Sequence, residues 1–197
     1  MQWDSRFGVD FHAAAQKASA DGAGKFNVTM AEMHPSPLTD LSDVSSFAGG
    51  KWRWQSWATA MGGAYSMHIR MDIANTPKRD LEDCGRVVTF MQSTDFTTMS
   101  PHDELGLGGT EYVLAHPGES YIAYARSLLG DIGLKGITAG TYSFRWFDCV
   151  NGTSVEQTGV SVPAGDQKWP KPDNIGRELA VYVRRTDAHP PSAAPRR

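Results

Sequence analysis

The sequence predicts an α/β segment followed by an all-β segment. Residues 8–92 alternate between helical and strand-like patterns, the order expected of parallel strands joined by helices. From residue 93 onward the patterns become short and two-residue periodic, with turn residues about every eight to twelve positions, as in an antiparallel β-sandwich. We therefore expect an α/β domain over 1–92, a β-sandwich over 93–186 and a disordered tail over 187–197.

The composition indicates a folded globular protein. Of the 197 residues, 40% are hydrophobic and 10% aromatic, which is enough for a packed core. The formal net charge of -3, without a basic patch, argues against binding to nucleic acid or to an anionic membrane. The sequence has no apolar run near the roughly 20 residues that span a bilayer and no signal-peptide pattern, so its localisation stays open. Cys84 and Cys149 match no metal or redox spacing.

A strand within residues 25–37 ends at a carboxylate. Alternation puts Glu32 last on an otherwise apolar face, just before His34 and two prolines that end the strand. A helix over 8–20, which is rich in alanine, precedes it. An acid at the carboxyl end of a strand is a candidate catalytic group, and the loop over 35–50 is a candidate cleft wall.

A tryptophan-rich helix is expected over residues 51–61. Trp54 and Trp57 lie on a helical stripe that indicates packing, and two glycines that follow end the helix. Trp52 and Arg53 stand at the helix start, nearer to any cleft, and are candidate substrate-binding residues.

A second strand is expected over residues 64–72. Its apolar residues alternate with a polar row that includes His68, Arg70 and Asp72. Such a row in an α/β sheet needs hydrogen-bonding partners or an open cavity, and an exposed face is the alternative. A helix over 78–92 then completes the α/β segment.

Strand-like segments separated by turns make up the second domain. Trp169, between prolines, is expected to be exposed and is the first candidate for stacking on a ligand, whereas most other aromatics of this domain are expected in the core. The expected strands are 111–116, 121–125, 131–137, 141–148, 154–162 and 178–185.

Both halves of the chain resemble parts of one enzyme family. The strand that ends at Glu32, with the following run Trp57-Ala-Thr-Ala-Met-Gly-Gly63, resembles the last two βα units of the apiosidase-like (β/α)8-barrel glycoside hydrolases. Residues 93–185 resemble the small β-sandwich that ends those enzymes, often described as a collagen-binding domain. Its motifs here are Tyr112-Val-Leu-Ala-His-Pro-Gly118 and Gly140-Thr-Tyr-Ser-Phe-Arg-Trp-Phe-Asp148.

The resemblance implies a retaining glycoside hydrolase in which Glu32 is the nucleophile. Such enzymes need a second carboxyl group about 5 Å away. In the family that group ends the fourth barrel strand, which this chain does not contain. Asp72, at the end of a neighbouring strand about 4.8 Å away, is the candidate substitute. Weaker candidates, in loops or at a helix start, are Asp40, Asp43 and Asp80. Glu32, His34 and His68 would also suit zinc or iron, but their spacing matches no known ligand motif, so we expect no metal or other cofactor.

Two classes of function stay open from the sequence. The chain is the C-terminal part of a glycoside hydrolase acting on polysaccharide, or it is a non-catalytic module that binds carbohydrate or protein through exposed aromatics such as Trp169. Two parallel strands cannot close a barrel. We therefore expect their edges to be covered by self-association or by a missing N-terminal portion of the barrel.

Overall fold

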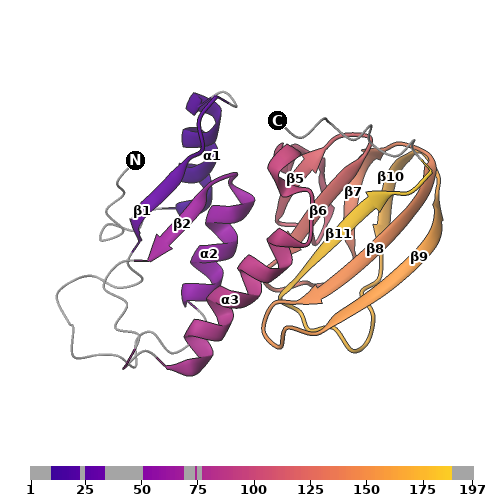
Figure 1. The fold of residues 1–197 in the computed structure, drawn as a ribbon. Helices are drawn as coiled ribbons and strands as arrows, with labels where there is room; N and C mark the ends of the chain where they lie inside the picture. Colours follow the sequence, from indigo (N-terminus) through magenta and orange to yellow (C-terminus); the bar gives the residue numbers. More distant parts are fainter. Residues whose placement is uncertain (1–9, 23–24, 34–50, 69–73, 75–76, 188–197) are drawn as a thin grey trace, which may run out of the picture.

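The computed structural model describes residues 10–22, 25–33, 51–68, 74 and 77–187 (Figure 1). Within this part of the chain, three α-helices separate a small parallel sheet from two antiparallel sheets (Figure 1). None of the described helices is long and apolar enough to cross a membrane. The fold is mixed helix and sheet, as the sequence predicts.

The first five elements follow the predicted order of helix, strand, helix, strand and helix. They are α1 (Phe11–Gly22), β1 (Thr29–Met33), α2 (Lys51–Met61), β2 (Tyr65–His68) and α3 (Lys78–Gln92). Strands β1 and β2 pair in parallel, with Thr29 opposite Tyr65 and Met33 opposite His68. Parallel pairing with a helical crossover is the arrangement expected of βα units.

Small residues let α1 and α2 approach closely. A Cβ atom added to Gly62, just after α2, would lie 2.5 Å from Ala15 Cβ and 2.9 Å from the His12 carbonyl oxygen. Gly63 follows with a φ of 80°, a left-handed conformation that glycine adopts without strain, and so ends the helix as predicted. Beneath this contact, Met30 of β1 is fully buried against Phe11 and other residues of both helices.

The remaining strands form two antiparallel sheets. The six-stranded sheet has the order β3-β5-β6-β11-β8-β9, and the three-stranded sheet has the order β10-β7-β4. Each expected strand segment contains a strand, and the structure adds three more, β3, β4 and β10. β3 and β4 are too brief to show a pattern, and β10 consists mostly of polar residues that resemble a loop. The strands are β3 (Ser100–Pro101), β4 (Gly106–Gly108), β5 (Tyr112–His116), β6 (Ser120–Ala125), β7 (Ile132–Ile137), β8 (Gly140–Asp148), β9 (Ser154–Val162), β10 (Gly165–Trp169) and β11 (Leu179–Arg185).

The six-stranded sheet has a hydrophobic core on each face. On one face, Val113 and Val181 share a cluster with Ile132 and Leu134 of the three-stranded sheet. On the other face, side chains of α2 and α3 pack on the sheet, and Trp57 is fully buried there, as its helical spacing predicts. The helices and both antiparallel sheets are therefore built around continuous apolar layers.

We predict that Gly62→Ala destabilises the protein by about 1–3 kcal/mol, because the new methyl group would force α1 away from α2. Urea unfolding followed by circular dichroism measures the change. Gly85→Ala is the matched control: a Cβ at Gly85 in α3 meets nothing within 4 Å, so this variant should gain up to about 1 kcal/mol from helix propensity. Equal stability of Gly62→Ala and the wild type would contradict the close approach.

Candidate functional site

The carboxyl ends of β1 and β2 meet at one edge of the parallel sheet. Met33 lies opposite His68, so the backbone of Glu32 and that of His68 come together at this edge. The N-terminal ends of α2 and α3 lie at the same end of the molecule (Figure 1). In βα folds this is the end at which ligands bind. We call it the carboxyl edge.

The structure describes only some of the predicted catalytic and binding residues. Glu32 and His68 belong to β1 and β2, and only their backbone is described. His34, Arg70 and Asp72 lie outside the described residues. The catalytic pair of Glu32 and Asp72 thus stays a prediction, with the strand end of Glu32 as its structural basis.

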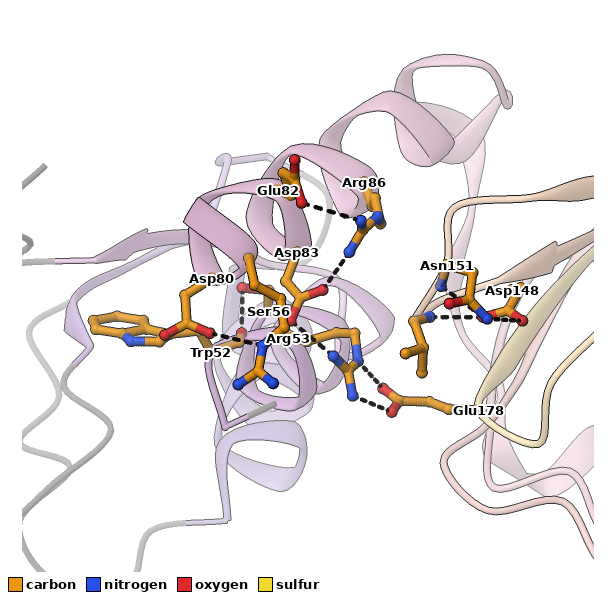
Figure 2. Close-up of polar contacts among 12 residues, drawn as sticks. Trp52, Arg53, Ser56, Asp80, Glu82, Asp83, Arg86, Asp148, Asn151 and Glu178 are labelled. Atoms are coloured by element: carbon orange, nitrogen blue, oxygen red, sulfur yellow. Dashed lines mark hydrogen bonds and ion pairs between the residues drawn. The ribbon is translucent and has the colours of Figure 1, made fainter. Parts of the chain in front are cut away.

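Trp52 and Arg53, expected to face a cleft, are directed into the protein. Trp52 is only 5% exposed, and its carbonyl oxygen accepts a hydrogen bond from Ser56 Oγ at 2.7 Å. Arg53 Nη1 lies 2.7 Å from Asp83 Oδ2, while its Nε and Nη2 donate to the two carboxylate oxygens of Glu178 at 3.0 and 2.9 Å (Figure 2). The guanidinium group therefore links α2, α3 and the residue before β11.

This buried network balances its own charge. Arg86 Nη1 donates to Asp83 Oδ1 at 2.6 Å, so Asp83, which is fully buried, receives two arginines. Burial lowers the pKa of Arg53, but the hydrogen bonds and charges of Glu178 and Asp83 outweigh it and hold that pKa above its ordinary value. Tyr124 Oη donates to Glu178 at 3.2 Å. The network ties the helices to the sheet.

Asp80 is an acid to which the sequence alone gave little weight. It lies in the first turn of α3, is 1% exposed, and neither carboxylate oxygen has a hydrogen-bond partner among the described residues. Burial raises the pKa of Asp80, and Arg79, whose Nε is 3.7 Å from Oδ1, opposes the increase. The sequence signal is weak because acids are common in the first turn of any helix. Because α3 begins at the carboxyl edge, Asp80 adds a second acid to the end of the molecule where Glu32 lies (Figure 1).

Trp169 is less exposed than the sequence predicts. Its ring is half-buried, lies 5.0 Å from the ring of Phe144 in an edge-on contact, and packs against the core between the antiparallel sheets. The expectation of an exposed Trp169 is therefore wrong. The reason is that β10, whose mostly polar residues Gly-Asp-Gln-Lys resemble a loop, pairs with β7, and Trp169 at its end packs toward the core.

A row of three polar residues has the order of a serine hydrolase triad. Ser100 Oγ lies 3.1 Å from His102 Nε2, and His102 Nδ1 lies 2.7 Å from Glu104 Oε1. Pro101, directly after the serine, has no N–H group to stabilise an oxyanion, and Glu104 is 68% exposed. These features argue against acyl transfer at this row. No group of three or more histidine, cysteine or acidic residues is placed to hold a metal ion in the described part of the chain.

Comparison with solved structures finds a fold similar to that of two glycoside hydrolases. One neighbour, described as a glycoside hydrolase, has a TM-score of 0.59 and 13% identity over 89% of this chain and 46% of its own. Another, a glycoside hydrolase family 5 protein from Bacteroides vulgatus ATCC 8482, has a TM-score of 0.59 and 11% identity over 88% of this chain and 45% of its own. No protein-family model and no curated protein sequence matches the chain.

At this low identity the comparison shows similarity of fold. The chain spans about half the length of the solved structures that it matches. The protein therefore has a partial glycoside hydrolase fold. The narrower resemblance to the apiosidase-like enzymes and to a collagen-binding domain stays a prediction.

We predict that Asp80→Asn is more stable than the wild type at pH 7. Because the native state holds this proton more tightly than the unfolded chain, Asp80 contributes stability below about pH 3.9, and the contribution is lost as pH rises through the raised native pKa. The advantage of Asp80→Asn should grow between pH 4 and pH 7 to on the order of 1 kcal/mol. Urea unfolding at several pH values measures it, with Asp173→Asn at an exposed position as the control. A constant difference across this range would contradict the interpretation.

Proposed function

We propose that the protein is carbohydrate-active and corresponds to the C-terminal portion of a retaining glycoside hydrolase that cleaves polysaccharide. One observation carries the proposal: two parallel βα units bring the backbone of Glu32 to the carboxyl edge of a fold similar to glycoside hydrolases over 89% of this chain. This edge is where such folds position catalytic groups.

In the proposed mechanism the Glu32 carboxylate attacks the anomeric carbon of the sugar. A neutral carboxyl group about 5 Å away protonates the leaving oxygen, and water then hydrolyses the glycosyl ester. Asp72 is the proposed acid within this chain. His34, His68 and Arg70 are proposed to bind sugar hydroxyl groups. Trp52, which is buried, and Arg53, whose side chain is 11% exposed, would support the edge by packing and ion pairing.

Turnover is proposed to require further parallel strands beside β1 and β2. Neither strand has a second neighbour among the described residues, and Tyr65 and Met67 of β2 are 46% and 48% exposed. Parallel sheets are normally covered on both faces. The remaining portion of a barrel, or a second copy of the chain, would complete the sheet and enclose the substrate.

We predict that Glu32→Gln lowers the turnover of aryl glycosides and polysaccharides by at least about 1,000-fold, because the amide cannot form the glycosyl ester. Activity is measured on a panel of both substrate types at several protein concentrations, so that self-association is detected. Glu119→Gln, at an exposed turn, is the matched control and should keep wild-type turnover.

Equal turnover of Glu32→Gln and the wild type would contradict the role of Glu32. Retention of the chain on a polysaccharide column without turnover would instead support a non-catalytic binding module.

A further inference from the structure

His12 is a buried histidine that the proposed mechanism does not use. It lies in the first turn of α1 and is 4% exposed. Its Nδ1 lies 2.9 Å from the carbonyl oxygen of Ala58 in α2, and its Nε2 lies 2.6 Å from Oδ2 of Asp103. The imidazole ring therefore joins three parts of the chain: α1, the last turn of α2 and the segment between β3 and β4.

Both partners of the ring are acceptors of hydrogen bonds. The carbonyl oxygen of Ala58 has no hydrogen to donate. Asp103 also accepts from the backbone N–H of Val113 at 2.8 Å and from the side-chain amide of Gln16. Burial raises the pKa of Asp103, but the hydrogen bonds from His12 and Val113 outweigh it and hold that pKa below its ordinary value. The carboxylate is therefore ionised at neutral pH.

A neutral imidazole cannot make both contacts as hydrogen bonds. It carries one N–H group, so its other ring nitrogen would turn a lone pair toward a carbonyl oxygen or a carboxylate. An imidazolium has an N–H group on each ring nitrogen and satisfies both acceptors. The geometry of this cluster thus selects the protonated form of His12.

Two further contacts favour a positive charge on the ring. The carbonyl oxygen of Ala58 belongs to the C-terminal end of α2, where the helix dipole is negative. The ring of Tyr112 in β5 stacks on that of His12, with centroids 3.6 Å apart and planes 17° apart, so a cation would face a π system.

Acidic groups lie around this stack. Asp10, directly before α1, accepts a hydrogen bond from the backbone N–H of His12 at 3.0 Å. Burial and the charges of Glu111 and Asp10 raise the pKa of Tyr112, so this tyrosine stays neutral. A protonated His12 therefore balances part of the negative charge of Asp103 and its surroundings.

We propose that His12 is a proton-dependent latch between α1 and the antiparallel sheets. As an imidazolium it holds α1 against both α2 and Asp103. When the ring loses a proton, one of the two contacts becomes repulsive and α1 is released from Asp103. Because α1 packs on Met30 of β1, the support of the strand that carries Glu32 then depends on pH. The latch does not require that Glu32 be catalytic.

The latch closes in a window of pH. Asp103 contributes stability above about pH 3.9, and this contribution is lost as pH falls through the lowered native pKa of Asp103. The contribution of His12 has the opposite sign: it is complete in acid solution and is lost as pH rises far enough to remove the proton from the ring.

Nitrogen-15 NMR of the histidine side chains tests the protonation state directly. At pH 7 we expect both ring nitrogens of His12 to carry hydrogen, with the signals assigned by their absence in His12→Gln. Asp103→Asn should move the loss of this proton to lower pH, because the amide gives the cation no charged partner. A wild-type His12 with one bare ring nitrogen at pH 7, or a proton loss that Asp103→Asn does not move, would overturn the latch.

Amide hydrogen exchange tests the release of α1. Protection factors, which correct for the intrinsic effect of pH on exchange, should fall at least about tenfold in α1 between pH 7 and the pH at which NMR shows His12 to be neutral. Those of β11, in the middle of the six-stranded sheet, should stay constant. His116→Gln, at a histidine whose side chain is 46% exposed, is the matched control and should behave as the wild type does.

In His12→Gln the protection of α1 should be low at both pH values, because one amide nitrogen cannot donate to Ala58 and Asp103 at once. Protection of α1 that does not change with pH in the wild type, or that falls equally in His12→Gln, would overturn the latch and leave the proposed catalytic function intact.

Discussion

Arg53 is the residue on which the relation between the helices and the sheet depends. Its guanidinium group bridges Asp83 of α3 and Glu178 before β11, with side-chain exposures of 11%, 0% and 12% (Figure 2). Removing such charges from water costs several kcal/mol per ion, and only near-complete pairing offsets that cost. The arrangement is stable only when all three groups keep their positions, so it specifies how α2, α3 and the six-stranded sheet fit together.

Aromatic packing next to Arg53 also holds α2 against the six-stranded sheet. Trp57, one turn further along α2, stacks on Tyr124 of β6 with ring centroids 5.3 Å apart, and Tyr124 in turn donates to Glu178. The helices that carry the carboxyl edge are thereby attached to the antiparallel sheets. Their attachment lets β1 and β2 present the strand end of Glu32 in a defined place.

Sequence patterns predicted the local structure well where periodicity was long and the signal local. Examples are the stripe that includes Trp57, the glycines after α2 and the strand that carries Glu32. Long-range pairing was not predictable: nothing near Arg53 in the sequence indicates Glu178, 125 positions away. Asp80 looked like an ordinary helix-start acid, and the inward direction of Trp169 depends on β10, a strand of mostly polar residues that resembles a loop in the sequence.

The most direct test of this account is the unfolding of the wild type and of Arg53→Met, followed by tryptophan fluorescence and backbone circular dichroism. A single coincident transition is predicted for the wild type, because adjoining apolar clusters and one ion-pair network join the helices to the sheets. Arg53→Met should lose about 3–5 kcal/mol, since Glu178 would be left without its cation in a largely buried position and Asp83 would keep only Arg86. Separate transitions of the wild type, or a loss below about 1 kcal/mol, would contradict the account.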